Sequence, residues 1–387
     1  MNIIYTPLTR LQAALDHREP DRIPLDIGST KVTGINIVAY RNLLQYKGWN
    51  ALDRQPRISD EVQQLAKVSE PVLQALGVDV RGIIPVAANK DDYAGDSNYI
   101  EFTDEWQTVW RMPRQGGLYF DVKTSPLTDV NGLDELANFT WPNPQDPGRL
   151  AGIEAELAAR GPASQHGLMM HGLCAGLLEM AGRLRGYEQF FMDLVLDPDY
   201  ACGLLDKIME LKMAFWDVAL DKAGDQLQIA VEADDLGTQA SLLISPDMYR
   251  KYFKPRHQKL FSYIKSKASH LKLFFHSCGS VYKLIPDLIE TGIDILNPVQ
   301  ISAQDMDLAK LKREFGDDVV FWGAGVDTQK NLPHGTVQSI RDEVKRSIEI
   351  LAPGGGFVFS AVHNIQADVP PENLLAMLEA FQEYGIY

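Results

Sequence analysis

Residues 271–276 form a short apolar run, Leu-Lys-Leu-Phe-Phe-His, and comparable runs follow at 293–297 and 319–323. Segments with helical patterns separate these runs from one another. Short apolar runs that alternate with helical segments are typical of βα units arranged around a parallel sheet. The middle of the chain therefore predicts an α/β fold.

The same alternation extends from this stretch towards both ends of the chain. Helices are predicted at Asp199–Lys222, Met248–Lys267 and Val337–Leu351; Ser245-Pro246 supplies a cap and a first-turn proline for the second of them. The number of predicted strands is about what a closed (β/α)8 barrel of the TIM type needs. The strands are expected near Arg22–Ile27, Val78–Ile84, Gly167–His171, Leu227–Glu232, Leu271–His276, Ile293–Asn297, Val319–Gly323 and Gly356–Ser360.

One long segment, residues 88–147, fits this alternation poorly because it is rich in Asp, Asn, Pro and Trp. We predict an insertion or a small β-element there, beside the barrel. Its Trp106 and Trp110 are expected to pack in a core, with a place in the wall of a substrate pocket as the alternative. The whole chain, residues 1–387, is otherwise predicted to form a single barrel domain.

The composition excludes several classes of protein. Lys and Arg number 37 against 52 Asp and Glu, a formal net charge of −15, which disfavours nucleic acid as a partner. No stretch approaches the roughly 18 apolar residues that a membrane span needs. The cysteines, Cys174, Cys202 and Cys278, are widely spaced, and the first two are interpreted as buried helix residues. Reduced thiols in a cytoplasmic protein are the expectation.

A barrel of this type carries its chemistry at the carboxyl ends of its strands, because the strand-to-helix loops converge there. This rule selects the polar residues at or just beyond the predicted strand ends as candidates. They are Asp79, Arg81, His171, Glu232, Asp234, Asp235, His276, Cys278, Asn297, Gln300, Asp327 and His363.

The sharpest local signal among these is His276-Ser277-Cys278. Residues two apart on an extended chain point the same way, so the imidazole and the thiol could approach one ion together. Zn²⁺ accepts both donor types and needs a third protein ligand. His363 follows the last predicted strand, and Glu232 emerges from an apolar run. The alternatives are a hydrogen-bonded histidine for His276 or His363 and an ion-paired or loop-capping carboxylate for Glu232.

Several segments together resemble the uroporphyrinogen decarboxylase superfamily. They are 18–24 (Arg-Glu-Pro-Asp-Arg-Ile-Pro), 245–249 (Ser-Pro-Asp-Met-Tyr), 276–279 (His-Ser-Cys-Gly) and 354–371. The resemblance covers nearly the whole chain and is strongest after about Leu227. It implies a (β/α)8 barrel with an N-terminal elaboration, and it makes a homodimer plausible.

This superfamily includes metal-free decarboxylases of porphyrinogens. Their N-terminal Arg-Gln-Ala-Gly-Arg-Tyr segment, whose arginines hold substrate carboxylates, has no counterpart here; the nearest region is 33–41, Thr-Gly-Ile-Asn-Ile-Val-Ala-Tyr-Arg. A substrate with many carboxylates needs several arginines to compensate its charge. Asp79 could occupy the essential aspartate position of that branch, so a decarboxylase of a carboxylated substrate stays as the alternative.

The superfamily also includes zinc-dependent methyltransferases that work with a corrinoid protein, and these share the His-x-Cys motif. Their second cysteine falls at His363 here, which replaces a thiolate by a neutral donor and leaves the metal a stronger Lewis acid. The resemblance thus implies a zinc site made by His276, Cys278 and His363, with Glu232 as a possible fourth ligand. We predict transfer of a methyl group from a small, methoxylated substrate.

In that hypothesis the zinc ion polarises the ether oxygen, and the corrinoid receives the methyl group. The corrinoid is expected on a separate protein, because the chain has no Asp-x-His-x-x-Gly segment to hold it. A barrel that binds a tetrapyrrole or corrinoid without catalysis is a third possibility. Asn297 and Gln300 are the predicted cofactor contacts, and the candidates for handling the proton of the leaving oxygen are Asp234, Asp235, His171 and Asp327.

Overall fold

The computed structural model describes residues 4–87, 93–160 and 165–387. Its main sheet has seven parallel strands in the order β13-β12-β11-β10-β9-β8-β3, so neighbours in sequence are neighbours in space. The predicted α/β barrel fold is confirmed. The strands are β3 (Val80–Ile83), β8 (Gly167–His171), β9 (Ile229–Ala233), β10 (Lys272–His276), β11 (Ile295–Asn297), β12 (Val320–Ala324) and β13 (Phe357–Ser360).

The segment predicted as the first strand closes the gap between β13 and β3 without forming a strand of its own. Asp26 N donates to Phe359 O, and Phe359 N donates to Pro24 O, both at 2.9 Å. On the other side, Asp79 N donates to Leu25 O at 2.9 Å. Because proline has no N–H to offer to a ladder, the pairing with β13 is limited to one parallel bridge, Leu25 with Phe359.

Side chains alternate between the two faces of each barrel strand, as strand geometry requires. One set, with Met169, Ile229 and Phe274 among its members, packs inside the barrel against Leu11 of α1 (Pro7–Leu15). This helix contacts β3, β8 and β13. It approaches β8 so closely that a Cβ on Gly167 would lie 2.1 Å from a Leu11 methyl group. Helix α1 therefore plugs the barrel, and the cavity described below opens elsewhere.

The other set of strand side chains packs against the helices that surround the barrel, and this layer is the main hydrophobic core. Among the described residues, every helix is too short or too polar to span a bilayer. The remaining helices are α2 (Ile37–Tyr46), α3 (Glu70–Leu76), α4 (Leu133–Asn138), α5 (Ile153–Arg160), α6 (Leu177–Arg185), α7 (Tyr187–Leu196), α8 (Pro198–Ala223), α9 (Pro246–Met248), α10 (Lys254–Lys267), α11 (Ile285–Thr291), α12 (Leu308–Phe315), α13 (Asn331–His334), α14 (Val337–Leu351) and α15 (Pro371–Tyr384).

The helix predicted over Met248–Lys267 is interrupted near its start. Ser245 Oγ accepts from Met248 N at 3.2 Å and caps α9 as expected, but residues Tyr249–Phe253 then form a π-helical turn before α10 begins. The other two predicted helices agree with α8 and α14 to within a residue at each end.

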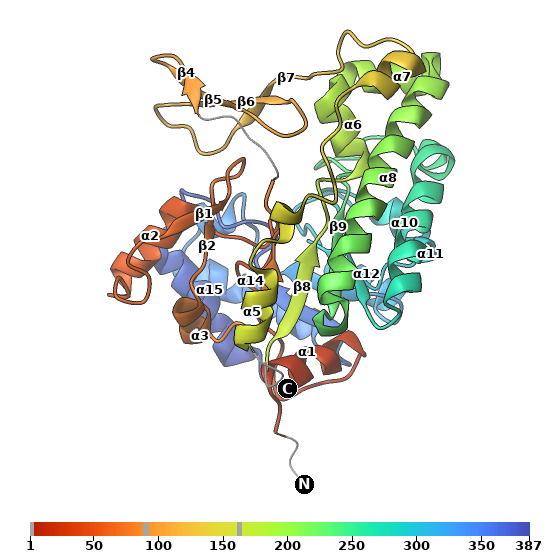
Figure 1. Cartoon of the computed structure of the whole chain (residues 1–387). Coiled ribbons are helices and arrows are strands. Elements are labelled where there is room, and N and C mark those ends of the chain that lie inside the picture. The colour runs from red at the N-terminus through yellow and green to blue at the C-terminus, as the bar shows by residue number, and fades with distance from the viewer. Residues whose placement is uncertain (1–3, 88–92, 161–164) are drawn as a thin grey trace.

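A small antiparallel sheet lies beside the barrel, within the predicted insertion, and Figure 1 shows its strands above one end of the barrel. Residues 88–92 of that prediction lie outside the described residues. Phe102, Trp110 and Phe120 form a separate apolar cluster that holds this sheet together. Its strands are β4 (Ala94–Gly95), β5 (Tyr99–Thr103), β6 (Val109–Pro113) and β7 (Asp121–Thr124); a second pair, β1 (Arg57–Asp60) and β2 (Leu65–Lys67), precedes it.

Candidate functional site

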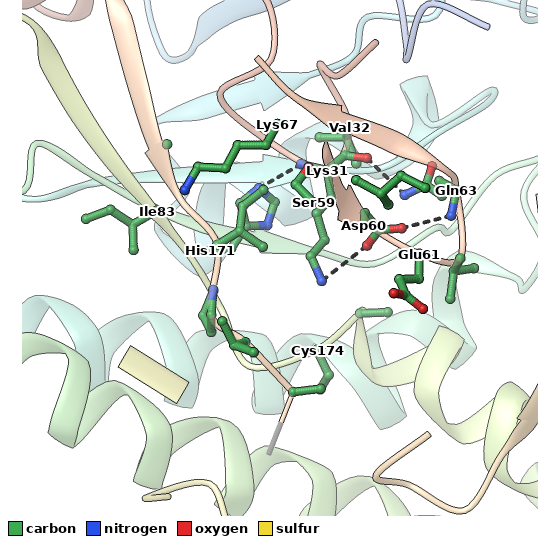
Figure 2. Close-up of a pocket in the computed structure, with 18 of the residues that line it drawn as sticks. Lys31, Val32, Ser59, Asp60, Glu61, Gln63, Lys67, Ile83, His171 and Cys174 are labelled. Carbon is green, nitrogen blue, oxygen red and sulfur yellow. Dashed lines mark hydrogen bonds and ion pairs between the residues drawn. The ribbon is translucent and has the colours of Figure 1, made fainter. Parts of the chain in front are cut away.

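A cavity of about 1300 Å³ opens where the barrel strands end. Its wall includes residues from the carboxyl ends of β3, β8, β9 and β10, from the β1–β2 pair and from the small sheet (Figure 2). Trp106 and Trp110 are buried, at 4% and 5% exposure, and both also line this cavity. The insertion therefore supplies one wall of the cavity. The position of the cavity agrees with the prediction that the site lies at the carboxyl ends of the strands.

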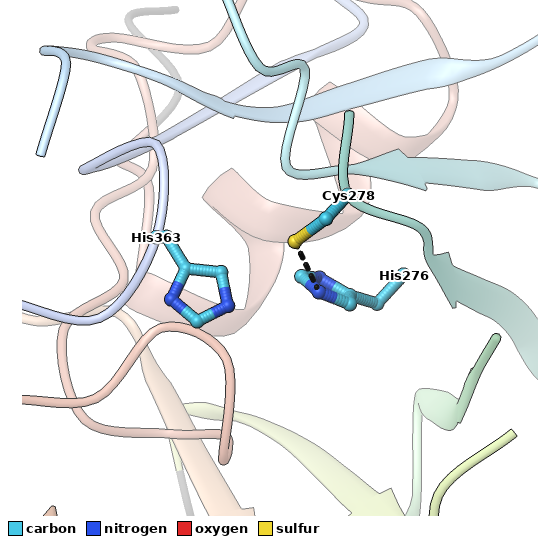
Figure 3. A group of neighbouring side chains, drawn as sticks. All are labelled: His276, Cys278 and His363. Carbon is cyan, nitrogen blue, oxygen red and sulfur yellow. Dashed lines mark hydrogen bonds between the residues drawn. The ribbon is translucent and has the colours of Figure 1, made fainter. Parts of the chain in front are cut away.

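Three predicted metal ligands meet at this cavity (Figure 3). His276 is the last residue of β10, Cys278 follows in the next loop, and His363 comes from the loop after β13. Their donor atoms lie within 4.8 Å of one another, and His276 Nε2 is 3.2 Å from Cys278 Sγ. A tetrahedral zinc ion holds neighbouring donors roughly 3.4–3.8 Å apart. Small side-chain rotations therefore suffice to bring the three donors onto one ion.

Asn297 orients the ring of His276. Its Nδ2 donates to Trp322 O at 2.8 Å, so its Oδ1 must accept the hydrogen of His276 Nδ1. This contact fixes the proton on Nδ1 and leaves the Nε2 lone pair facing Cys278. A hydrogen bond to the outer nitrogen of a ligating histidine is the usual way that proteins orient such ligands. Asn297 therefore supports His276, whereas the sequence suggested a direct cofactor contact.

The loop that carries Cys278 is held by side chains of its neighbours. Asp235 Oδ1 accepts from Cys278 N at 2.8 Å, and Gln300 Oε1 accepts from Gly279 N at 2.7 Å. Gly279 has φ +87°, and a Cβ there would lie 2.5 Å from the backbone of Gly237, so only glycine fits. Gln300, the other predicted cofactor contact, thus fixes the turn after Cys278 and does not line the cavity.

Burial sets the protonation of the three donors. It lowers the pKa of His363 to about 3, with His276 adding to the effect, and it also lowers the pKa of His276. Burial and the nearby Asp235 carboxylate raise the pKa of the Cys278 thiol well above its usual range. Two neutral imidazoles and a buried thiol in one place form a donor set of the kind that Zn²⁺ accepts, so the residues fit this ion.

Glu232, the predicted fourth ligand, is not part of this group. It shares its face of β9 with Ala230, which packs against the helix layer, so its side chain points away from the barrel interior. Its Oε2 lies 2.8 Å from Lys212 Nζ, and its Oε1 accepts from Trp216 Nε1 at 2.7 Å. Both partners come from α8. The ion-paired alternative is the one that the structure realises.

Two other predicted residues lie away from the cavity. Asp234 is fully buried, where its carboxylate accepts from Leu178 N at the start of α6 and contacts His257 Nε2 at 3.1 Å. Asp327 accepts from Gln329 N and does not line the cavity. Of the four predicted proton-handling residues, only Asp235 and His171 face it.

The prediction that Asp79 lies at a carboxyl strand end is wrong. Strand β3 begins at Val80, so Asp79 precedes it and lies at the opposite end of the barrel. Its carboxylate is 2.7 Å from both Arg10 and Arg22 and accepts from Leu25 N at 2.8 Å. Asp79 is therefore a fully paired structural carboxylate.

Sequence reasoning missed several residues of the cavity wall. Arg183 is in contact with Glu179 at 3.2 Å, four residues before it in α6, and lies over the ring of Trp110. Cys174, predicted in a helix, lies in the loop after β8 and lines the cavity, whereas Cys202 lies in α8 as expected. The i, i+4 spacing of Glu179 and Arg183 was visible in the sequence, but it is equally common on solvated helices.

A sequence profile of the uroporphyrinogen decarboxylase (URO-D) family matches residues 134–384, which is more than half of the chain. The protein belongs to this family. The uroporphyrinogen decarboxylase of Geobacter sulfurreducens is 23% identical over 270 residues, covering 68% of this chain and 74% of that protein. The enzyme of the same name from Geobacter metallireducens is 22% identical over 295 residues, covering 74% and 80%.

Among solved structures, a methyltransferase from Methanosarcina mazei has a similar fold. The TM-score is 0.62 with 20% identity, and the match covers 98% of this chain and 99% of that one. The likeness therefore extends over the barrel and the N-terminal part alike.

Proposed function

We propose that the protein is a zinc-dependent methyltransferase that moves a methyl group from an oxygen of a small methoxylated molecule to a corrinoid on a separate protein. The observation that carries this proposal is the meeting of His276, Cys278 and His363 at the wall of the cavity, which His276 and His363 line. The methyltransferase name of the structural neighbour from Methanosarcina mazei supports it. The decarboxylase names of the sequence relatives support the alternative.

The decarboxylase alternative is weakened by the position of Asp79. Asp79 is the residue that could take the aspartate position of the decarboxylase branch, but its carboxylate is 0% exposed and bound by two arginines at the other end of the barrel. The segment of family arginines that would hold substrate carboxylates is also missing from the sequence.

In the proposed site His276, Cys278 and His363 hold the zinc ion. When bound, such an ion acts as a Lewis acid that makes the oxygen of a methyl ether a better leaving group. Asp235 is the residue that handles the proton of the released oxygen. It lines the cavity 3.6 Å from His276 Nε2, while Asp234 and Asp327 do not line it. Trp106 and Trp110 add apolar surface to a wall that also holds Arg149 and Arg183, and this surface suits the apolar part of a substrate.

A methyl-transfer assay tests this proposal. Zinc-loaded protein is mixed with cob(I)alamin, in place of the partner-bound corrinoid, and with methoxybenzene or methoxyphenols. Formation of methylcobalamin is followed by absorbance. We expect Cys278→Ala and His363→Ala to lower the rate by at least about 100-fold, since Lewis-acid assistance is worth several kcal/mol.

Cys202→Ala is the matched control, because this cysteine lies in α8 away from the site, and it is expected to keep the wild-type rate. Wild-type activity that does not depend on zinc, or full activity in Cys278→Ala, would contradict the proposal. Release of carbon dioxide from a carboxylated substrate, with no methyl transfer, would support the decarboxylase instead.

A further inference from the structure

His171 is part of the cavity wall, together with charged residues that include Lys31 and Asp60. It is the last residue of β8 and shares its face with Met169, which packs inside the barrel. Its side chain therefore points into the mouth of the barrel, where it is 8% exposed and lines the cavity. Figure 2 shows its ring in this wall, with a contact to the backbone of Lys31.

That contact fixes the tautomer of the ring. Lys31 N lies 3.0 Å from His171 Nε2. A backbone N–H can only donate, so Nε2 must carry a lone pair and the ring hydrogen must be on Nδ1. Burial, with Lys31 as the next cause, keeps the pKa of His171 well below its usual value, in agreement with a neutral ring. His171 is therefore unsuited to proton transfer through Nε2.

The loop segment 30–34, here called the strap, carries Lys31 and is itself held in place. Asn364, next to His363, donates from Nδ2 to Lys31 O at 2.8 Å and accepts from Gly34 N at 2.6 Å. Among the described residues, none accepts a hydrogen bond from His171 Nδ1. Because His171 is 8% exposed and lines the cavity, its Nδ1 hydrogen is available to a ligand oxygen there.

This donor is separated from the proposed metal ligands. Strand β9 lies between β8 and β10, with His171 opposite Val231 and His276 opposite Ala233. Two strand spacings put the backbones of His171 and His276 about 10 Å apart. One ligand oxygen is therefore not expected to serve both places.

We infer that His171 Nδ1–H binds a second oxygen of the methyl donor, so that the substrate is a methyl ether with a further acceptor oxygen on the same molecule. The inference rests on the proposed function only for the identity of the first oxygen, the one that carries the methyl group. His171 is then a positioning residue: it orients the ether without touching the reacting atoms.

Two variants separate this role from that of holding the strap. The amide nitrogen of asparagine can take the place of Nδ1, so His171→Asn keeps a donor towards the cavity and loses the acceptor for Lys31 N. The amide of glutamine reaches the place of Nε2, so His171→Gln keeps the strap contact and loses the cavity donor. Thermal unfolding of both variants reports how much each loosens the strap.

Binding to zinc-loaded protein is measured by calorimetry with matched probes. The ortho, meta and para isomers of methoxyacetophenone carry a carbonyl oxygen, and the corresponding ethyl-methoxybenzenes have the same carbon skeleton without it. We expect at least one ketone to bind the wild type about fivefold more tightly than its ethyl counterpart, the worth of one neutral hydrogen bond. This preference should persist in His171→Asn and vanish in His171→Gln.

Equal binding of ketone and ethyl probes by the wild type, or a preference that survives in His171→Gln, would overturn the inference. Nitrogen NMR of histidine-labelled wild type gives an independent check if a variant fails to fold. A neutral Nδ1–H tautomer of His171 near pH 7 is expected, and an Nε2–H tautomer or an imidazolium ion would also overturn it. Neither measurement depends on methyl transfer, so a failure of the proposed function can be distinguished from a failure of this inference.

Discussion

The barrel has a group of buried ionisable side chains at each end, and the two groups are built differently. At the plugged end, the Asp79 carboxylate is surrounded by donors: Arg10, Arg22 and a backbone N–H. At the open end, the Cys278 thiol is hydrogen-bonded to His276 Nε2 at 3.2 Å, His363 lies beside them, and burial keeps both histidines neutral.

This difference supports the proposal that the first group is structural and that the second binds a ligand. Buried polar groups are normally paired within the protein, because an unpaired one costs free energy. The paired group is complete without a ligand, whereas the converging donors gain a common partner only when a cation binds. Substitutions in the paired group around Asp79 are expected to affect stability alone. Substitutions of His276, Cys278 or His363 are expected to affect zinc binding and activity.

The pair Glu232–Lys212 gives the largest expected effect on stability. Glu232→Gln leaves the Lys212 ammonium, which is 1% exposed, without its counter-charge. Losing one partner of a buried ion pair costs about 3–5 kcal/mol. Urea unfolding measures this loss, and zinc content should stay at the wild-type level. Glu154→Gln, at a 75% exposed side chain near Lys222, is the control with little change. Loss of zinc from the Glu232→Gln protein would show instead that Glu232 is a metal ligand.

Asp79→Asn tests the plugged end and should have a smaller effect. Arg22 is 28% exposed and Arg10 keeps Asp21 as a partner, so neither arginine is left fully uncompensated. We expect a loss of roughly 2 kcal/mol in the free energy of unfolding, with unchanged zinc content and methyl transfer. Asp16→Asn, at a half-exposed carboxylate, is the matched control. An Asp79→Asn protein that is stable but inactive would favour the decarboxylase reading.

Asn297→Ala tests the open end of the barrel and should lower the affinity for zinc. Without the amide oxygen the His276 ring loses its fixed tautomer, and such outer contacts are worth about 10–100-fold in metal affinity. Competition with a chelator measures the zinc affinity. Asn297→Asp keeps an acceptor for Nδ1–H and should recover most of it, and the exposed Asn131→Ala should change nothing. Equal affinities for Asn297→Ala and the wild type would remove this role.

Between about pH 7 and pH 6, the pH dependence of the metal-free protein should show the smallest effect, below about 1 kcal/mol. His363 is held neutral with a pKa of about 3, below its usual 6.5. The unfolded chain therefore binds an extra proton between these values, and stability falls as the pH is lowered through about 6.5. Urea unfolding of metal-free wild type and His363→Gln at several pH values isolates this contribution as the difference between them. Parallel curves would show that His363 does not contribute.

Much of the fold could be predicted from the sequence, because apolar runs and helix caps are local signals. The positions of β8, β10 and α14 follow directly from them. A strand was predicted near Arg22–Ile27, but proline at position 24 cannot donate to a ladder, and the segment forms only a single bridge with β13. Asp79 was assigned to the wrong end of its strand: it is the second residue of the predicted run Val78–Ile84 and precedes β3, so it lies at the amino end in both cases.

The sequence predicted the part of the candidate site in which the spacing of residues along a strand determines where their side chains point. His276 and Cys278 share one strand end, whereas His363 follows β13, which β11 and β12 separate from β10 in the sheet, and was assigned to the site through the resemblance to the family motif. The same two-residue alternation would have placed Glu232 with Ala230 on the outer face. Its partner Lys212, the Asn297 contact and the Lys31 contact to His171 join segments far apart in sequence, so no local pattern reveals them.

Zinc stoichiometry tests the central claim most directly. Elemental analysis of protein purified with zinc supplied should give one zinc ion per chain in the wild type and in Cys202→Ala, and almost none in Cys278→Ala or His363→Ala. A wild type that binds no zinc, or a Cys278→Ala protein that retains a full equivalent, would contradict the claim that these three side chains form a metal centre.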